Sequence, residues 1–365
     1  MKNVCFFNSV EFWGGGEKLH LEYALEFKKK GYNVIIASKN NSPLNKKAEL
    51  SGLEVFGVTI NNLSFLNPFK ILNLVIFFKR KKIDTVIFSG SHDLKIGCLS
   101  AKLAGVKEIV YLRGLAAPIK NSLINRITFK YFLTHIVANS DETKRSILQN
   151  IEGYIDESKV KTIYHGIEIN NSTLNRNNKL IEITSQSSGV ILGNAGRLTK
   201  QKGQHHLIEV ARKLKEKDIA FTLFIAGTGE MQTELEVLIQ QYELQKEVIL
   251  LGFVKDMVGF MNSIDIFLLT SIWEGFGYVI VEAMIKSKPV VAFDISSNPE
   301  IIVNNKTGFL VNYPDLEEFE LKTELLIKNE ALRQEFGKSG NQRVLNQFDI
   351  SDRITEFENY LLFKN

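Results

Sequence analysis

The chain has very little cysteine. Only Cys5 and Cys98 occur among its 365 residues, and each lies in an apolar stretch. Two thiols are too few for the disulfide framework of a small secreted domain, and too few to ligate a structural zinc ion. The sequence therefore indicates a reducing compartment, and we expect a cytoplasmic protein.

Long apolar runs are also missing. The first one, Val4–Phe7, is short and is followed by the polar residues Asn8 and Glu11, which a signal peptide would not have. The longest later run, Ile71–Phe78, contains Asn73 and is far shorter than the roughly 18 to 20 residues needed to cross a bilayer. We expect neither a secretory leader nor a transmembrane helix.

Metal-binding patterns are absent as well. No Asp-x-Asp occurs, and no histidine, aspartate and glutamate residues cluster at metal-ligand spacing. Negative charge on a leaving group would then be stabilised by basic side chains and helix amides. We expect no metal and no other cofactor.

Charge is distributed unevenly along the chain. Hydrophobic residues make up 44% and charged residues 24%, which is typical of a globular protein, and the length favours two domains. Residues 1–168 carry 24 Lys+Arg against 15 Asp+Glu, whereas the remainder carries 21 against 26. The excess of +9 in the first part is explained either by solvated helix ends or by an anionic membrane surface or acceptor. We expect no nucleic-acid partner.

Short β-branched or aromatic runs alternate with helical patterns, which is typical of βαβ units and parallel sheets. One series fills 1–169, a polar stretch at 170–188 resembles a linker, and a second series fills 189–345. Helices are predicted from Gln204, Glu230 and Tyr278, and the whole of Leu332–Leu362 has a helical pattern. We predict an α/β protein of two Rossmann-like, doubly wound domains, with a helix at 346–365 that crosses back to the first.

Two glutamates frame the strongest motif, which runs from Glu274 to Glu282 and follows the predicted strand Ile266–Leu269. Gly275 and Gly277 open a helix whose first amides would face the carboxyl edge of the sheet, where α/β proteins bind ligands. Glu274 can accept hydrogen bonds from ligand hydroxyls, and Glu282 can contact a second polyol such as ribose. The alternative is that both are exposed acids at a helix end.

Two further loops open predicted helices. Arg197 and Lys202 lie on one loop between the strand Val190–Leu192 and the next helix, where they could clamp a diphosphate or simply be solvated. Gly14-Gly15-Gly16-Glu17 follows the first strand and allows a ligand to approach the backbone. It does not complete the dinucleotide fingerprint, because Leu19 replaces the third glycine, and no Walker lysine pattern occurs. An NAD or ATP enzyme is thereby disfavoured.

These motifs together resemble the retaining GT-B glycosyltransferases of family 4, also described as glycosyltransferase group 1. The family's E-x-F-G-x-x-x-x-E motif is matched at Glu274, Phe276, Gly277 and Glu282, and its G-G-x-E motif at the N-terminal glycines. The resemblance covers nearly the whole chain. It implies two Rossmann-like domains facing across a cleft, with the nucleotide-sugar donor bound by the second domain.

The resemblance also implies roles for single residues. Glu274, Arg197 and Lys202 would be the catalytic residues, the first at the donor sugar and the two cations at the diphosphate. Glu282 would bind the ribose. The remaining donor-binding positions that it implies are Gly15, Gly16, Phe253, Val254, Gly275, Phe276, Gly277 and Tyr278.

One position departs from the family pattern. Many members have a histidine after the fifth strand, where this chain reads Tyr111-Leu112-Arg113-Gly114. Arg113 could bind a phosphate or an acidic acceptor. His92, after the fourth strand, could approach the site from its loop, or could be a solvated loop residue.

The leading functional hypothesis is transfer of a hexose from a UDP- or GDP-linked sugar to a cell-surface glycan such as lipopolysaccharide, exopolysaccharide or another lipid-linked glycan. A sugar-nucleotide epimerase of the same architecture and a non-catalytic nucleotide-sugar-binding protein are the alternatives. The segment Ile119–Leu133 adds a hypothesis about location, because an apolar stripe recurs at helical spacing beside basic residues. The stripe consists of Leu123, Ile124, Ile127 and Tyr131, and the basic residues are Lys120, Arg126 and Lys130. Such a helix would either lie on an anionic membrane surface or pack against its own sheet.

Overall fold

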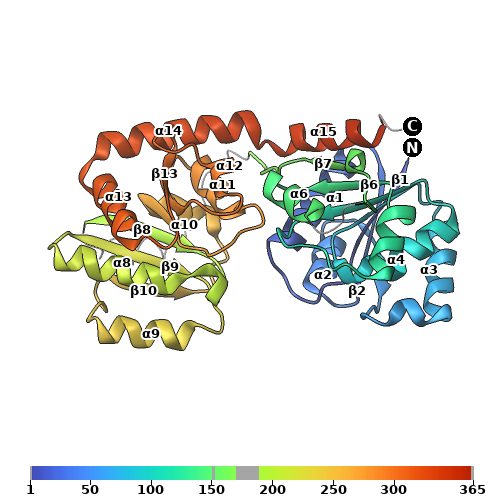
Figure 1. Ribbon diagram of the computed structural model, residues 1–365, viewed down its shortest axis with the longest axis horizontal. Coiled ribbons are helices and arrows are strands. Elements are labelled where there is room, and N and C mark those ends of the chain that lie inside the picture. Colours follow the sequence, from blue (N-terminus) through green and yellow to red (C-terminus); the bar gives the residue numbers. More distant parts are fainter. Residues whose placement is uncertain (1, 150–152, 170–188, 363–365) are drawn as a thin grey trace. The chain divides into compact units, whose positions relative to one another are not determined.

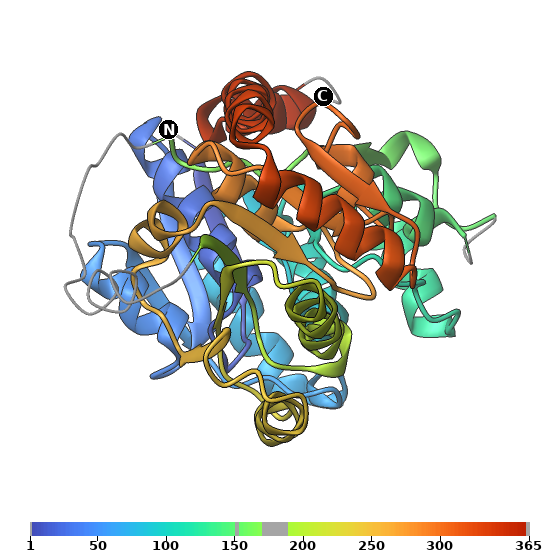
Figure 2. The same ribbon diagram turned by 90° about the vertical axis from the view of Figure 1, so that its left-hand side faces the viewer.

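The computed structural model describes residues 2–149, 153–169 and 189–362. It consists of two compact units, the first formed by Met1–Gly166 with Ile350–Asn365 and the second by Ile167–Asp349. Within each unit a parallel sheet lies between helices, as Figures 1 and 2 show. The predicted linker at 170–188 lies outside the described residues.

The first unit contains a parallel sheet of seven strands in the order β3-β2-β1-β4-β5-β6-β7. The strands are β1 (Asn3–Asn8), β2 (Asn33–Lys39), β3 (Glu54–Val58), β4 (Thr85–Phe88), β5 (Glu108–Arg113), β6 (His135–Ala138) and β7 (Val160–Thr162). Their apolar runs are explained by burial on both faces. Phe6 packs against His20 and Phe27 on one face, whereas its neighbour Phe7 packs against Phe88 on the other.

Helices cover both faces of this sheet. On the face of Phe6 lies α1 (Gly15–Lys29), which contacts α2 (Pro43–Leu50) and α15 (Ile350–Leu362). On the face of Phe7, α4 (Ser91–Ala104) contacts both α3 (Pro68–Arg80) and the π-helical turn η2 (Thr128–Phe132), which continues α5 (Leu123–Ile127). The remaining elements are α6 (Asp141–Leu148) and the 3-10 turns η1 (Ser64–Leu66) and η3 (Glu157–Lys159).

The second unit contains a parallel sheet of six strands in the order β10-β9-β8-β11-β12-β13. The strands are β8 (Val190–Ala195), β9 (Phe221–Ala226), β10 (Val248–Gly252), β11 (Ile266–Leu269), β12 (Val290–Phe293) and β13 (Gly308–Val311). The helices are α8 (Gln204–Glu216), α9 (Gln232–Gln241), α10 (Met257–Ser263), α11 (Tyr278–Ile285), α12 (Asn298–Ile301), α13 (Leu316–Lys328) and α14 (Glu330–Gln347), with the 3-10 turn η4 (Lys200–Lys202). Contacts of α8 with α9 and α13, and of α11 with α10 and α14, form the two covering layers.

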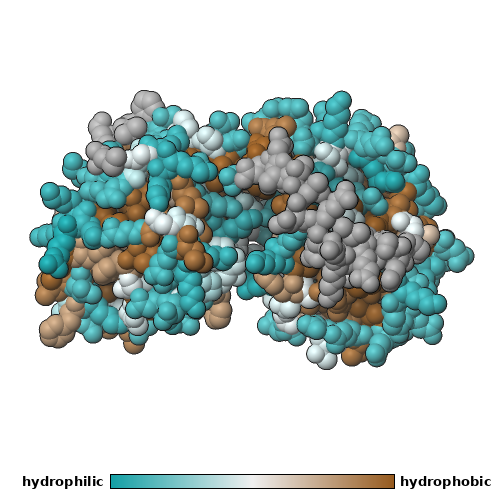
Figure 3. All heavy atoms as spheres, turned by 180° about the vertical axis from the view of Figure 1, so that it is seen from behind, coloured by the Kyte–Doolittle hydropathy of each residue, from teal (hydrophilic) through white to brown (hydrophobic). Residues whose placement is uncertain are grey.

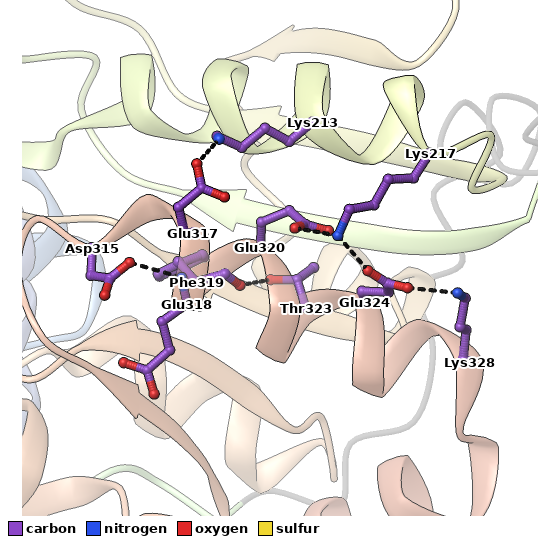
Figure 4. A network of polar contacts seen from close by, with 10 residues as sticks. All are labelled: Lys213, Lys217, Asp315, Glu317, Glu318, Phe319, Glu320, Thr323, Glu324 and Lys328. Atoms are coloured by element: carbon purple, nitrogen blue, oxygen red, sulfur yellow. Dashed lines mark hydrogen bonds and ion pairs between the residues drawn. The ribbon is translucent and has the colours of Figure 1, made fainter.

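A network of ion pairs holds α13 against α8, as Figure 4 shows. Lys217 Nζ lies 2.7 Å from Glu320 Oε2 and 2.8 Å from Glu324 Oε2, and Lys328 Nζ lies 2.6 Å from Glu324 Oε1. Hydrogen bonds from these two lysines hold the pKa of Glu324 at about 2. The network thus links α8 and α13, the two helices that cover one face of the second sheet.

Two predicted helix boundaries are wrong. The helix predicted from Glu230 begins at Gln232, because the Met231 amide is bonded to the Leu198 carbonyl. The helical pattern of Leu332–Leu362 is broken between α14 and α15, where Phe348 is buried. The second helix packs on α1, and its Phe357 ring contacts Tyr23.

The predicted α/β class, with two doubly wound Rossmann-like sheets, is confirmed. Within the described ranges, no helix has the length and apolar character needed to span a bilayer.

Candidate functional site

Each sheet reverses its strand order at one place. The reversal lies between β1 and β4 in the first unit and between β8 and β11 in the second. Loops that leave such a pair of strands diverge to opposite faces, so ligands bind at their carboxyl ends.

The helices that follow these four strands start in the same way. Their N-cap residues are Gly14 for α1, Gly90 for α4, Gly203 for α8 and Gly277 for α11, and none of them forms a side-chain cap hydrogen bond. The N-caps of α2, α3, α6, α10, α13 and α14 instead accept a hydrogen bond through Ser, Asn or Asp. Uncapped amides at a helix N-terminus can donate to an anion or a polar ligand.

Lys202 and Glu274 meet at the reversal point of the second sheet. Lys202 Nζ lies 2.6 Å from Glu274 Oε1, and the same oxygen accepts a 2.6 Å hydrogen bond from Ser271 Oγ. Their side chains are 18% and 8% exposed. The sequence assigned these residues to different groups of the ligand, and the structure joins them in one nearly buried pair. An ammonium has three donors, so Lys202 can bind Glu274 and still donate to a phosphate.

Hydrogen bonds hold the loop after β8 against the loop after β11. The Ile272 amide donates to the Gln201 carbonyl at 2.8 Å, and Gln201 Nε2 donates to the Trp273 carbonyl at 3.0 Å. Gly203 has φ +62, and a Cβ there would lie 2.2 Å from the Thr270 carbonyl oxygen. The close approach of the two loops therefore requires glycine at this position.

Arg197 lies on the same loop with its guanidinium exposed. Among the described residues its side chain has no hydrogen-bond or ion-pair partner. Its backbone is fixed, because the Leu198 amide donates to the Thr228 carbonyl at 3.0 Å and a Cβ at Gly227 would lie 1.8 Å from the Gly196 carbonyl oxygen. A free cation on a rigid loop is suited to an incoming anion.

The middle of the Glu274–Glu282 motif serves packing. The Phe276 ring is buried and lies edge-on against Phe348, with centroids 5.7 Å apart. Gly277 has φ +78 and makes the turn into α11. Only the backbone of Phe276 can therefore meet a donor at this point.

The other predicted residues of the motif lie at the start of α11. Gly275 and Tyr278 are half-buried and flank the uncapped amides. Glu282 is half-buried in the second turn of the helix.

Phe253 and Val254 follow β10 at the carboxyl edge of the same sheet. The Phe253 side chain is 74% exposed, and Val254 is half-buried. An exposed aromatic ring at this edge can stack on a planar base.

Gly15 and Gly16 open α1 after β1, the strand at the reversal point of the first sheet. A Cβ at either position would meet nothing within 4 Å, and neither has a positive φ. Packing within the chain therefore does not require glycine here, unlike at Gly203.

His92 follows β4 and Arg113 ends β5, so both lie near this first reversal point. His92 is not a loop residue, because α4 begins at Ser91, and its Nε2 lies 2.9 Å from Ser9 Oγ. Arg113 ends β5 and is buried; its guanidinium donates to Tyr111 Oη at 2.7 Å and to the Ala117 carbonyl at 2.8 Å. In the described parts of the chain it forms no ion pair.

Sequence reasoning missed the residues that orient these groups. Ser271 could have been noticed, since it lies three residues before Glu274. Ser9 and Asp93 carried no signal, because only the pairing of β1 with β4 brings them together. Across the residues with described positions, no group of three or more His, Cys, Asp and Glu side chains is arranged to hold a metal ion.

Two Rossmann-like sheets of this kind are typical of the GT-B class. A model of Glycosyltransferase Family 4 matches residues 13–171, and a model of Glycosyl transferases group 1 matches residues 176–343. The chain belongs to this family of glycosyltransferases and has the GT-B fold.

Its relatives include enzymes of surface-glycan synthesis. The UDP-Gal:alpha-D-GlcNAc-diphosphoundecaprenol alpha-1,3-galactosyltransferase of Escherichia coli is 23% identical, covering 90% of this chain and 88% of that protein. The capsular polysaccharide biosynthesis glycosyltransferase CapM of Staphylococcus aureus is 27% identical, covering 89% and 88%. The crystal structure of HepE from Anabaena in complex with UDP and glucose is 22% identical, with a TM-score of 0.86 over 99% of both chains.

Proposed function

We propose that this glycosyltransferase moves a hexose from a UDP- or GDP-linked sugar to a lipid-linked or cell-surface glycan, with retention at the anomeric carbon. The observation that carries the proposal is the Lys202–Glu274 pair between the uncapped ends of α8 and α11. It combines a cation for phosphate, a carboxylate for sugar hydroxyls and two helix N-termini whose N-cap is a glycine.

Each part of the donor then has a partner in the second unit. Arg197 and Lys202 bind the diphosphate, and Glu274 with the amides from Gly275 to Tyr278 binds the hexose. Glu282 binds the ribose hydroxyls. Phe253 and Val254 contact the base.

The reaction needs no metal in this proposal. The charge that develops on the departing diphosphate is stabilised by Arg197, Lys202 and the amides of α8, which are already in place. The departing phosphate itself accepts the proton of the attacking hydroxyl on the same face, and this leads to retention. EDTA should leave turnover unchanged; loss of activity on chelation and its return with Mg²⁺ or Mn²⁺ would contradict the proposal.

The acceptor is proposed from the relatives. The Escherichia coli relative is named for a lipid-diphosphate-linked N-acetylglucosamine and the Staphylococcus aureus relative for capsular polysaccharide. Glycans of lipopolysaccharide, exopolysaccharide and other lipid-linked types share a hydroxyl nucleophile near negative charge. Arg113 is placed to bind an anionic group of such an acceptor if the Ala117 loop releases it.

Donor consumption separates this function from its alternatives. UDP-glucose, UDP-galactose, UDP-N-acetylglucosamine and GDP-mannose are incubated with the protein, and free nucleotide and sugar are followed by NMR. A transferase releases the nucleoside diphosphate and a sugar whose anomeric configuration reports retention. An epimerase of the same architecture would interconvert UDP-sugars, and a binding protein would leave all four unchanged.

We further propose that the first unit lies on an anionic membrane surface. Residues 55–140 contain 12 Lys+Arg and only three acidic residues, of which Asp93 and Glu108 are buried. The outer side of α3 exposes Phe69, Leu72 and Ile76, and Figure 3 shows apolar surface at that edge of the unit. Apolar side chains among cations suit an interface of anionic lipid.

The predicted membrane segment Ile119–Leu133 is shorter as a helix than expected. It begins at Leu123 and continues as the π-helical turn η2, in which Phe129 is buried. Leu123, Ile127 and Tyr131 are nevertheless exposed. The proposed surface therefore comprises α3 together with α5 and η2.

Co-sedimentation with vesicles of phosphatidylglycerol and phosphatidylcholine tests this surface. Binding at low salt that decreases as salt rises is expected, because screening weakens the contacts of the cations. Leu72→Ser should weaken binding, whereas Val237→Ser, an apolar position on α9 of the second unit with the same exposure of 55%, should not. Absence of binding at low salt would contradict the proposal.

A further inference from the structure

Ser9, His92 and Asp93 form a hydrogen-bonded relay at the reversal point of the first sheet. Ser9 follows β1, and the other two residues lie in the first turn of α4. Ser9 Oγ lies 2.5 Å from Asp93 Oδ1 and 2.9 Å from His92 Nε2, and the Ser9 amide donates to Asp93 Oδ2 at 3.0 Å. A carboxylate, a hydroxyl and an imidazole are thus linked in a row.

Hydrogen-bond counting fixes the direction of this relay. Ser9 Oγ has one hydrogen, and the short contact to the Asp93 carboxylate uses it. The contact with His92 must then be a donation from Nε2–H to Ser9 Oγ. In the neutral imidazole, Nδ1 consequently carries the lone pair, and no described residue bonds to it.

The carboxylate end of the relay is buried, and its imidazole end is partly exposed to solvent. The Asp93 side chain is fully buried, whereas the His92 side chain is 30% exposed. A Cβ at Gly90 would lie 2.5 Å from Asp93 Oδ2, so glycine is needed there for the carboxylate to reach Ser9. Burial raises the pKa of Asp93, and His92 and the Ser9 hydrogen bonds oppose that shift.

The contact between β1 and α4 does not depend on His92. The two bonds from Ser9 to Asp93 already tie the end of β1 to α4, and the imidazole adds a third contact that leaves Nδ1 without a partner among the described residues. At the same edge α1 begins with Gly15 and Gly16, where a Cβ would meet no atom of the described residues within 4 Å. Such a place suits a polyol whose hydroxyl group donates to a fixed nitrogen.

We infer that His92 binds a hydroxyl group of the acceptor sugar through Nδ1, and that Ser9 and Asp93 are positioning residues that hold the imidazole in the required tautomer. This inference rests on the proposed transferase function and concerns its acceptor. The proton of the attacking hydroxyl still leaves with the departing phosphate, and His92 contributes a hydrogen bond that orients the sugar.

The kinetic test uses the full chain, the donor that the wild type hydrolyses and a short-chain lipid-diphosphate N-acetylglucosamine as acceptor. His92→Gln keeps an N–H that can donate to Ser9 but has no acceptor at the Nδ1 position. It should raise the acceptor KM about tenfold, the loss of roughly one hydrogen bond. Donor hydrolysis without acceptor and the donor KM should stay within about twofold of wild type.

Two further variants distinguish binding from folding. Ser9→Ala should raise the acceptor KM by about threefold, and adding it to His92→Gln should have no further effect, because both act through one contact. Lys102→Gln on the same helix is the control and should change nothing. An unchanged acceptor KM in His92→Gln, or an equal loss of donor hydrolysis, would overturn the inference; absence of donor hydrolysis by the wild type would instead contradict the proposed function.

A second measurement does not depend on the choice of acceptor. Nitrogen-15 NMR of the imidazole at pH 8 should show His92 as the Nε2–H tautomer in the wild type and a mixture of tautomers in Ser9→Ala. An Nδ1–H tautomer in the wild type would overturn the inference. If the chosen acceptor is not used, this result alone decides.

Discussion

The two units have the same strand order around their reversal points but carry different side chains there. Both have a parallel sheet that reverses between its first strand and the strand beside it, with uncapped helices at that point. The second unit, which carries 19 Lys+Arg against 24 Asp+Glu, holds an ion pair there. The first carries 26 against 17 and holds a relay ending in a half-exposed imidazole. The fold thus determines where a ligand binds, and the side chains determine its chemistry.

The largest expected effect comes from breaking the ion pair of the second unit at its carboxylate. Glu274→Gln should lower transfer at least about a hundredfold, because several bonds from the donor hydroxyls and Lys202, each worth about 1.5 to 3 kcal/mol to a carboxylate, weaken to about 0.5 to 1.5 kcal/mol when the acceptor becomes neutral. Folding should be little affected, since the amide oxygen still accepts from Ser271. Turnover measured beside Glu234→Gln, an exposed residue of α9, checks this; wild-type turnover would remove Glu274 from the site.

Removing the Arg197 side chain and removing the Lys202 side chain should lower the activity by similar amounts but change the stability of the protein by different amounts. Arg197→Ala and Lys202→Ala should each lower turnover about a hundredfold. Lys202→Ala should also lower the free energy of unfolding by about 2 kcal/mol, because it leaves the buried Glu274 carboxylate with Ser271 alone. Arg197 is exposed, so its loss should leave the thermal midpoint unchanged. Equal thermal midpoints for the two variants would argue against the buried pair.

Glycine substitutions test whether the N-termini of α1 and α8 differ in their need for glycine. Gly203→Ala should destabilise the second unit by about 2 kcal/mol or more, because of its positive φ and the collision with Thr270. Gly15→Ala should leave the free energy of unfolding unchanged or raise it by up to about 1 kcal/mol, since alanine favours a helix. A chemical-denaturation series measures both. If Gly15→Ala proved as damaging as Gly203→Ala, glycine at position 15 would be needed for packing.

Acid should distinguish the units by a smaller effect. Burial lowers the pKa of His20 and of His165 in the first unit to about 3. An unfolded histidine titrates near 6.5, so the free energy of unfolding is complete above that pH and falls by up to about 1.4 kcal/mol per pH unit for each residue below it. In the second unit burial lowers the pKa of the half-buried His206 to about 4 and also lowers that of His205, so these residues contribute with the same sign.

Glu324 of the second unit acts in the same direction as the histidines, but at lower pH. Its pKa of about 2 lies below the usual value, so its contribution is lost only as pH falls from about 4 towards 2. Between pH 7.5 and 5.5 both units should therefore lose amide-exchange protection through their histidines, and the loss through Glu324 in the second unit should follow only below about pH 4. Protection that stays unchanged in both units at pH 5.5 would show that the buried histidines do not control acid stability.

The candidate site was predicted unevenly from the sequence. The positions of Arg197, Lys202 and Glu274 could be read from glycine-rich loops after apolar runs, because such loops end at the carboxyl edge of a parallel sheet. The ionic contact between two of them could not, since the residues are 72 positions apart and only the pairing of β8 with β11 joins their loops. Phe276 was assigned to the donor site as part of a motif, and the packing of its ring on Phe348 depends on where α14 ends.

The sequence by itself determined the α/β class, the two Rossmann-like series, the family and the loops that carry charge. Those properties are local, since apolar periodicity and glycine positions act over a few residues. Only the tertiary structure decided that Ser9, His92 and Asp93 meet, that Arg113 is buried without a carboxylate partner among the described residues, and that a Cβ at Gly15 would meet no described atom within 4 Å. These depend on strand order, which brings β1 beside β4 across more than seventy intervening residues and leaves no trace in local patterning.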